Sequence, residues 1–306
     1  MVKRITGTIR GILSFTLYFL NTLFWTLAIL FIAFFKILVP IKSWQDFCGG
    51  ILTSLADGWI RINIVNHQIF SRIIWKVEGT EGLKQKDWYM VIANHQSWVD
   101  ILVLQKIFYR KIPFLKFFLK NELIWFPVLG QAWWALDFPF MKRYSVSDIK
   151  KNPGLRGKDL EITQKACKKF KTIPTSIMNF VEGTRFTREK HLQQKSPFNN
   201  LLRSKAGGLA FAMASIGDQM RCLLDVTIVY PDGKKNFWDF ICGNIGEIRV
   251  KVKSYPINLE LIGDYSKDRE FRKNFHKWLN DIWEKKDLCI QEMKTSDENI
   301  AATHSG

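Results

Sequence analysis

A long uncharged segment near the N-terminus sets the strongest limit on how this chain can fold. Residues 11–35 contain no Asp, Glu, Lys or Arg, and the apolar run continues past Lys36 to residue 39. A helix of that length reaches roughly 43 Å at 1.5 Å per residue, more than the ~30 Å hydrocarbon core of a bilayer. A cleaved signal peptide would be shorter and would be followed by small residues at its cleavage site. We therefore predict a membrane-embedded helix rather than a buried helix of a soluble core.

Pro40 divides the N-terminal region, residues 1–66, into two predicted helices. The second, residues 43–65, is weakly apolar and carries Trp44 and Trp59, a residue type enriched at membrane interfaces. Basic residues lie on both sides of the uncharged segment, which the positive-inside rule does not expect of one straight crossing. We predict a two-helix anchor that enters one leaflet or turns back, with both ends cytoplasmic. A single span is the alternative.

The rest of the chain, residues 67–294, is predicted to form one mixed, largely parallel α/β domain. Short apolar runs rich in β-forming residues alternate with longer periodic stretches, which is typical of a parallel sheet with helices on its faces. Strands are predicted at 72–77, 88–93, 175–181, 223–230 and 248–255, and helices at about 97–109, 121–134, 158–171 and 205–216. An amphipathic helix is predicted over 267–294, followed by a disordered tail over 295–306.

The basic composition indicates a polyanionic partner. The 306 residues include 45 Lys and Arg against 28 Asp and Glu, a formal net charge of +17, which favours nucleic acid or an anionic membrane. The N-terminal anchor favours anionic membrane lipids, and no recognised nucleic-acid-binding motif occurs.

The five cysteines are widely spaced without a C-x-x-C pair. Neither a disulfide framework nor a zinc site is therefore predicted, and a reducing compartment is favoured.

Two histidines are followed by an aspartate five positions later, His95 by Asp100 and His276 by Asp281. The second pair falls inside the predicted helix 267–294, where a five-residue offset turns the side chains about 140° apart. We interpret that pair as part of a solvated helix face. The first pair lies between a predicted strand and a predicted helix, the usual place for an active site in an α/β protein.

The spacing of His95 and Asp100 allows two interpretations. Asp100 could orient the imidazole and leave its other ring nitrogen as a general base. Alternatively, Ser97 and Asp100 match a capping box at the start of the helix, which requires no catalysis. No serine or cysteine nucleophile is evident beside them except Ser97, which the helix start would use.

A second group of polar residues follows the strand predicted at 175–181. Gly183 allows close backbone approach, Thr184 offers a hydroxyl group, and Arg185 offers a planar set of donors suited to phosphate. Glu182 could orient the guanidinium group of Arg185. An ordinary turn with a surface salt bridge is the alternative.

These motifs together resemble those of the glycerolipid acyltransferases, the lysophosphatidic acid acyltransferase family. NHQSWVD at 94–100 resembles the His-x4-Asp block, and FVEGTR at 180–185 resembles the Glu-Gly-Thr-Arg block. Between and after them, in the family order, lie KNELIWFPVLGQAWW at 120–134, FMKR at 140–143 and TIVYPDG at 227–233. The resemblance covers about residues 75–232.

The resemblance implies roles for individual residues. His95 would deprotonate the acceptor hydroxyl group, with Asp100 as its partner. The acceptor phosphate would be bound by a set that comprises Arg185, Arg143, Lys120, Glu182, Gly183 and Thr184. Apart from the resemblance, Lys205, which precedes Ala206-Gly207-Gly208, is a further candidate for contact with a donor or acceptor phosphate. Such enzymes use no metal, no other cofactor and no covalent acyl-enzyme, because the hydroxyl group attacks the thioester of acyl-CoA or acyl-carrier protein directly.

The identity of the acceptor is less closely specified. The third block commonly has Gly three residues before its Phe, where this chain has Asp137. The stretches 183–191, 203–208 and 225–231 resemble the branch with lysocardiolipin-type acyltransferases and bacterial inner-membrane relatives. Lysophosphatidic acid is the expected acceptor, and lysophosphatidylglycerol or lysocardiolipin is the alternative. The expected location is the bacterial inner membrane, with the catalytic domain on its cytoplasmic face.

Two other classes of protein compete with an acyltransferase. A nucleic-acid-binding protein would account for the charge, and a non-catalytic membrane scaffold would account for the anchor.

Several aromatic residues could line an acyl tunnel, but residues at helical spacing are more often core residues or interfacial anchors. They are Trp125, Phe126, Trp133 and Trp134. His191 is interpreted as a surface residue.

Overall fold

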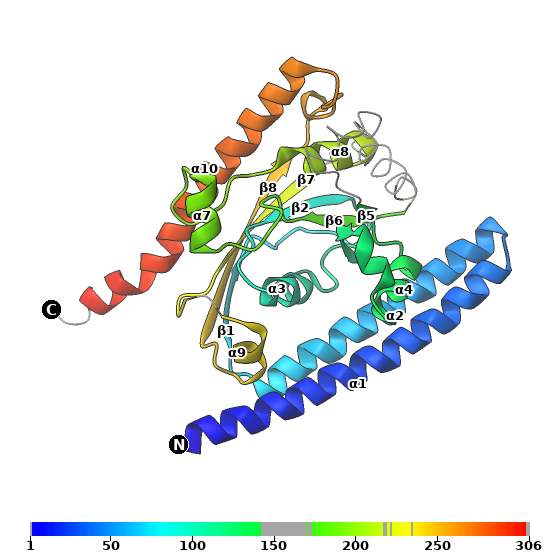
Figure 1. Ribbon diagram of the computed structural model, residues 1–306, viewed down its shortest axis with the longest axis horizontal. Helices are drawn as coiled ribbons and strands as arrows, with labels where there is room; N and C mark the ends of the chain where they lie inside the picture. The colour runs from blue at the N-terminus through cyan, green and yellow to red at the C-terminus, as the bar shows by residue number, and fades with distance from the viewer. Residues whose placement is uncertain are drawn as a thin grey trace.

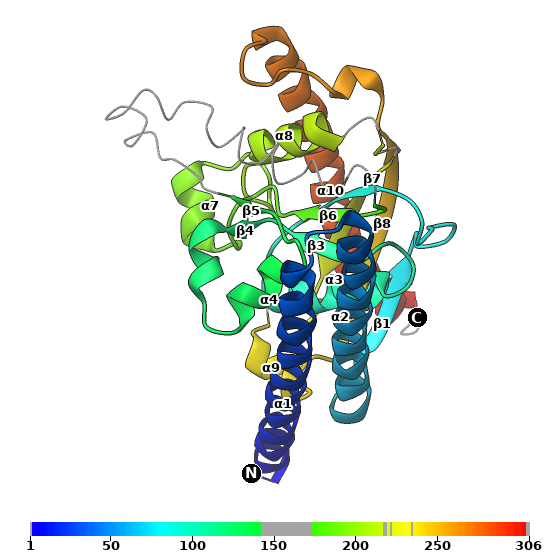
Figure 2. The same ribbon diagram turned by 90° about the vertical axis from the view of Figure 1, so that its right-hand side faces the viewer.

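The computed structural model describes residues 2–141, 170, 173–216, 219–220, 222–233 and 235–303. Two long helices, α1 (Val2–Leu38) and α2 (Lys42–Phe70), form an antiparallel hairpin that lies along one side of the molecule (Figures 1 and 2). Pro40 lies in the short break between them. The expected division at Pro40 is therefore present, and α2 ends four residues beyond the boundary predicted at residue 66.

The hairpin buries its polar side chains between its two helices and exposes apolar ones. Ser14 Oγ donates to Asn66 Oδ1 at 2.9 Å, and Asn21 Nδ2 donates to Asn63 Oδ1 at 2.8 Å. On the outer surface, the large apolar side chains include Phe24, which is 64% exposed. By length and composition, α1 is suited to crossing a membrane over Ile5–Leu38. An exposed apolar surface of this extent is unusual for a soluble protein.

A six-stranded sheet forms the centre of the domain, in the order β1-β8-β7-β2-β6-β3. All neighbouring pairs are parallel except β7 and β8. The strands are β1 (Ile74–Glu78), β2 (Tyr89–Ala93), β3 (Leu115–Phe117), β6 (Ser176–Asn179), β7 (Cys222–Val229) and β8 (Glu247–Pro256). The predicted mixed, largely parallel sheet is confirmed, and the three-residue strand β3 was not predicted.

Helices cover both faces of this sheet (Figure 1). The shorter elements are α3 (Val99–Phe108), η1 (Asn121–Trp125), α4 (Leu129–Ala135), α7 (Arg188–Gln194), α8 (Ala206–Ile216), α9 (Phe237–Ile241) and η3 (Leu259–Leu261). The last helix is α10 (Arg269–Thr303), and β4 (Leu119–Lys120) pairs with β5 (Phe140–Met141) in a separate two-stranded sheet. One core layer lies between the sheet and α3, α4, α9 and the hairpin, and the other lies beneath α8 and α10.

One predicted helix and the predicted disordered tail differ from the structure, and a second predicted helix cannot be compared. The predicted helix 121–134 is instead η1 followed by α4, because Pro127 has no backbone N–H group and Val128 adopts a φ of +67°. The tail predicted to be disordered from residue 295 is helical as far as Thr303, since extending an existing helix requires no new nucleation. The helix predicted at 158–171 lies outside the described residues except for residue 170.

The central strand β2 explains why the site can be held rigidly. All five of its side chains are buried, and they alternate between the two core layers, with Val91 in one and Met90 in the other. A strand buried on both faces has little freedom to shift. The residues that directly follow it therefore start from a fixed position.

An ion pair in the interior joins α10 to the sheet. Lys286 Nζ lies 2.7 Å from Asp225 Oδ1, and both side chains are almost completely buried. Lys286 Nζ also donates to the carbonyl group of Val226 at 2.5 Å.

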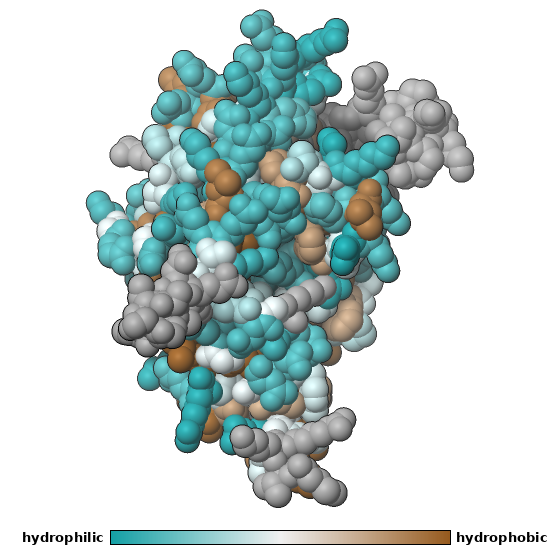
Figure 3. Space-filling view, turned by 90° about the vertical axis from the view of Figure 1, so that its left-hand side faces the viewer, coloured by the Kyte–Doolittle hydropathy of each residue, from teal (hydrophilic) through white to brown (hydrophobic). Residues whose placement is uncertain are grey.

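The surface of the molecule seen in Figure 3 is mostly hydrophilic, with apolar residues scattered over it, in contrast to the outer face of α1.

Candidate active site

Three neighbouring strands deliver residues to one edge of the sheet. β2 ends two residues before His95, β6 ends one residue before Phe180, and β7 ends one residue before Tyr230. These strands are adjacent and parallel, so their carboxyl ends meet at one edge, where α/β proteins usually bind ligands. The three segments form the candidate active site.

The structure brings His95 and Asp100 into direct contact. His95 Nδ1 lies 2.9 Å from Asp100 Oδ2, and the carboxyl group of Asp100 is fully buried. An ionised carboxylate only accepts hydrogen bonds, so we assign the proton to Nδ1. The side chain of His95 is 13% exposed and lines a pocket. Its Nε2 atom is therefore the ring nitrogen left for a substrate.

Asp100 combines the two roles that its spacing suggested. Its Oδ2 atom accepts from the backbone N–H groups of Gln96 at 2.6 Å and Ser97 at 2.8 Å, as a residue at a helix start does. The same atom also accepts from the imidazole of His95. The hydroxyl group of Ser97 accepts from the N–H of Val99 and donates to a backbone carbonyl group. Ser97 therefore serves the helix start, as expected.

Two residues at this site were missed by sequence reasoning. Tyr230 donates its hydroxyl group to Asp100 Oδ1 at 2.6 Å, and burial raises the pKa of Tyr230 well above its usual value. Phe180 stacks on the imidazole of His95, with ring centroids 3.9 Å apart and planes 15° apart. Both residues lie at the ends of predicted strands. That position and their place in the blocks FVEGTR and TIVYPDG were available signals, but the direction of their side chains was not predictable.

Glu182 has a different partner from the one we predicted. Its side chain is fully buried, and its two carboxylate oxygens accept from the backbone N–H groups of His95 at 2.8 Å and Leu202 at 2.9 Å. Burial raises the pKa of Glu182 to about 7, against the lowering effect of these two N–H groups and of Lys286. Glu182 is not among the residues that line the pocket. It holds the His95 backbone rather than orienting Arg185.

A tight turn places the loop after β6 beside His95. Gly183 has a φ of +70°, which glycine adopts without strain, and its N–H donates to the carbonyl of Phe180 at 2.8 Å. Lys190 Nζ donates to Thr184 Oγ1 at 2.7 Å. Phe186 donates its N–H to the carbonyl of His95 at 2.7 Å. The loop is thus tied directly to the histidine.

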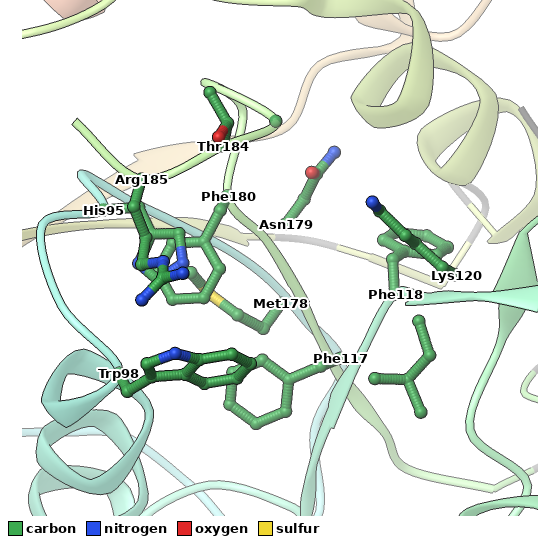
Figure 4. Close-up of a pocket in the computed structure, with 12 residues that line it drawn as sticks. His95, Trp98, Phe117, Phe118, Lys120, Met178, Asn179, Phe180, Thr184 and Arg185 are labelled. Carbon is green, nitrogen blue, oxygen red and sulfur yellow. The ribbon is translucent and has the colours of Figure 1, made fainter. Parts of the chain in front are cut away.

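Cationic side chains lie on two sides of one pocket (Figure 4). Arg185 lies with its Cζ atom 4.9 Å from the ring centroid of Trp98, on the same side as His95, and Lys120 lies on the opposite side. The pocket has a volume of about 300 Å³ and is lined by His95, Trp98, Phe117, Phe118, Leu119, Lys120, Met178, Asn179, Phe180, Gly183, Thr184 and Arg185. The arrangement suits an anionic ligand with an apolar portion.

The remaining candidate residues lie elsewhere. Arg143 lies outside the described residues. Lys205 does not line the pocket; its side chain is exposed, and its backbone N–H donates to the carbonyl of Val181 at 2.7 Å. His191 contacts the carbonyl of Phe198 through Nε2 at 2.6 Å. In the described part of the chain, no three His, Cys, Asp or Glu side chains are grouped as metal ligands would be.

The aromatic residues of η1, of α4 and of the link between them do not line the pocket described above. Trp125 is 80% exposed, and Phe126 and Trp134 are also exposed. Trp133 is partly buried against the core. These positions agree with the interpretation that they are core or interfacial residues, not lining residues of this pocket.

The fold and the site define an α/β protein in which a histidine, oriented by a buried carboxylate, shares one pocket with two cationic side chains. The family model described as Acyltransferase matches residues 74–230, and the chain belongs to this family. The matched region contains His95, Asp100, Glu182 and Arg185, together with Tyr230 at its end. The resemblance inferred from the motifs is therefore confirmed at the level of the family.

Individual relatives are distant. The chain is 23% identical to 1-acyl-sn-glycerol-3-phosphate acyltransferase epsilon of Mus musculus, with 70% of this chain and 60% of the relative covered. It is 23% identical to 1-acyl-sn-glycerol-3-phosphate acyltransferase 3 of Arabidopsis thaliana, with 69% and 55% covered. The chain thus spans somewhat more than half the length of these curated relatives.

A solved structure shows the same fold. The crystal structure of the 1-acyl-sn-glycerophosphate acyltransferase PlsC from Thermotoga maritima superposes with a TM-score of 0.52 at 19% identity. The match covers 93% of this chain and 98% of that chain. The predicted α/β architecture is therefore confirmed. At this identity the likeness concerns the fold and not the substrate.

Proposed function

We propose that this protein is a membrane-bound acyltransferase that acylates the free hydroxyl group of 1-acylglycerol-3-phosphate, lysophosphatidic acid, to give phosphatidic acid. One observation carries the proposal. The imidazole of His95, oriented by a buried carboxylate, lines the same pocket as the cationic side chains of Arg185 and Lys120. A general base beside a phosphate-binding pair suits an acceptor that carries a hydroxyl and a phosphate group.

The chemical step follows from the hydrogen bond to Asp100. His95 Nε2 takes the proton of the acceptor hydroxyl group as its oxygen attacks the carbonyl carbon of the acyl thioester. The resulting tetrahedral intermediate collapses with cleavage of the C–S bond, and the imidazolium returns its proton to the departing thiolate. Asp100 stabilises the imidazolium during this sequence and keeps the ring in one orientation. The thiol of coenzyme A or acyl-carrier protein is released.

The acceptor phosphate is bound between the two sides of the pocket. Arg185 supplies a planar set of donors whose position is supported by the ring of Trp98. Lys120 supplies a point charge from the opposite wall. Gly183 and Thr184 line the pocket beside them. Arg143 remains a predicted contributor on sequence grounds.

The hairpin of α1 and α2 attaches the enzyme to the membrane that contains its acceptor. Its exposed apolar surface would be covered by lipid, and the formal charge of +17 would favour an anionic leaflet by about 1 kcal/mol per well-placed Lys or Arg. We place the hairpin in one leaflet of a bacterial inner membrane, with the domain on the cytoplasmic side. The acyl thioester then arrives from the cytoplasm. Lys205, outside the pocket, is a candidate for contact with its phosphate groups.

The test is acyl transfer from a radiolabelled acyl thioester to lysophosphatidic acid in detergent micelles. His95→Ala should lower kcat by about 10²- to 10⁴-fold, the usual contribution of a general base. Arg185→Ala should raise the acceptor KM and leave the thioester KM nearly unchanged. The matched controls are His276→Ala, which has the same spacing to an aspartate, and Arg188→Ala, an exposed arginine nearby. Both should keep wild-type rates.

The same assay distinguishes the alternatives. A panel with lysophosphatidylglycerol and lysocardiolipin identifies the acceptor with the highest kcat/KM, and parallel assays with acyl-CoA and acyl-carrier protein identify the donor. Undiminished transfer by His95→Ala would contradict the assigned base. A wild-type protein that acylates none of these acceptors from either donor would instead favour a membrane scaffold.

A further inference from the structure

The end of the membrane anchor contacts the segment that forms one wall of the pocket. Lys36 lies in the last turn of α1, and its Nζ atom donates to Asp137 Oδ2 at 3.1 Å. Both side chains are partly buried, with 22% and 32% of their surfaces exposed. The end of α1 is held from the other side, because Trp44 Nε1 donates to the carbonyl of Phe35 at 3.0 Å. The ammonium group is therefore presented to Asp137 from a defined position.

The backbone conformation of Asp137 indicates that its side chain is used. Asp137 has a φ of +60°, a left-handed conformation that glycine adopts without strain and that other residues adopt at some cost. Backbone hydrogen bonds close the turn without the side chain, from the N–H of Asp137 to Trp134 and from the N–H of Phe138 to Trp133. Glycine would satisfy the turn. The carboxylate adds a contact with α1 that glycine could not make.

Asp137 leads directly into the strand pair that carries Lys120. β5 begins three residues later and pairs in parallel with β4, so that Met141 lies opposite Lys120. The N–H of Leu119 donates to the carbonyl of Pro139 at 3.0 Å. β4 and β5 form a sheet of their own. Lys120 therefore takes no part in the strand pairing of the six-stranded sheet.

The chain between β4 and β5 is packed closely enough to act as one unit. A Cβ atom on Gly130 of α4 would lie 2.2 Å from the carbonyl oxygen of Ile124 in η1, so the two elements are in backbone contact. α4 also packs against α1. A displacement of the segment 119–141 relative to α1 would therefore move Lys120 relative to His95.

We infer that Lys36 is a positioning residue for the acceptor pocket: through its ion pair with Asp137, α1 holds the segment 119–141 so that Lys120 faces His95 and Arg185. The inference rests on the proposed function in one respect, which is that Lys120 binds the acceptor phosphate. The anchor is then a structural part of the pocket wall as well as the attachment to the membrane.

The kinetic test uses Lys36→Met, Asp137→Gly and the double variant in full-length protein. Asp137→Gly relaxes the turn while removing the carboxylate, so loss of folding does not confuse the result. Each single variant should raise the acceptor KM by about two- to fivefold, as for the loss of one partly exposed ion pair. The thioester KM and kcat should stay unchanged. The double variant should be no worse than Asp137→Gly alone, because either substitution already removes the pair.

A matched control and a second measurement complete the test. Lys42→Met removes an exposed lysine at the same end of the hairpin, whose partner Asp46 lies on its own helix, and should leave the acceptor KM unchanged. Hydrogen exchange of a peptide that contains residues 118–120, without any substrate, should be faster in Lys36→Met and Asp137→Gly than in the wild type. This measurement decides the inference even if the protein acylates no lysophospholipid, an outcome that would refute only the proposed function. An unchanged exchange rate of the 118–120 peptide in the two single variants would overturn the inference about Lys36. Increases in the acceptor KM that add in the double variant would also overturn this inference.

Discussion

The buried carboxyl group of Glu182 makes a prediction about the stability of the protein at different pH values. Its side chain is fully buried, and burial raises its pKa to about 7 from an ordinary value of 4.5. A raised pKa means that the folded state holds this proton more tightly than the unfolded state does. The stabilisation is therefore present below about pH 4.5 and is lost as the pH rises through about 7.

The size of the effect follows from the two pKa values. Between pH 5 and pH 8 the contribution of Glu182 to the free energy of unfolding should fall by about 2.5 kcal/mol. Glu182→Gln has nearly the same shape and does not titrate. The free energy of unfolding of the wild type, minus that of the variant, should therefore decrease by this amount over the same interval. The pH-independent cost of replacing the carboxyl group cancels in the comparison.

The assay is urea unfolding of the detergent-solubilised protein, followed by tryptophan fluorescence at pH 5 and pH 8. Glu189→Gln, which changes an exposed carboxylate on the neighbouring helix α7, is the control and should show no comparable change. A wild-type minus variant difference that is constant between the two pH values would refute the reasoning. It would mean that the two backbone N–H donors outweigh burial and keep Glu182 ionised throughout.

Two further predictions concern residues that support the site. Tyr230→Phe removes the hydroxyl donor to Asp100 Oδ1 and should lower the free energy of unfolding by about 1.5–3 kcal/mol, as for a hydrogen bond to a charged group. Steady-state assays should show a lower kcat with both KM values unchanged. A wild-type kcat in this variant would show that Asp100 does not need this donor. Trp98→Ala removes the ring beneath Arg185 and should raise the acceptor KM by about two- to fivefold, the equivalent of an exposed cation–π contact. Trp98→Phe should restore most of the loss, and equal KM values for the two variants would argue against stacking.

The strands were predictable because burial leaves a clear pattern. β2 is covered on both faces, so its sequence is a short apolar run between polar segments. The helix predicted at 121–134 was wrong because its apolar spacing looked helical although Pro127 interrupts it. Strands of two or three residues, such as β3 and β4, leave too short a pattern to be recognised.

The partners of individual carboxylates were harder to predict. Asp100 had two reasonable interpretations from its spacing, and in the structure one carboxylate makes the hydrogen bonds that both require. Glu182 was expected to pair with the arginine three residues later, yet it accepts from backbone N–H groups, one of them at Leu202, twenty residues away. Backbone donors carry no signature in the sequence. Tyr230 was missed for a similar reason, since its hydrogen bond to Asp100 joins the end of β7 to the start of α3, 130 residues away in the sequence.

The ion pair between Lys286 and Asp225 has a consequence for the order in which the protein folds during synthesis. Asp225 lies on the interior strand β7, on the face that α10 covers, so a chain that ends before α10 lacks both the cation that pairs with Asp225 and the helix that buries it. The ribosome makes the α1–α2 hairpin before the sheet, so on the proposed function the hairpin can enter the membrane while the sheet is still incomplete. The domain can close only after α10 emerges and supplies its lysine. We therefore expect nascent chains that lack α10 to be membrane-attached and protease-sensitive, with the site completed only after α10 has been translated.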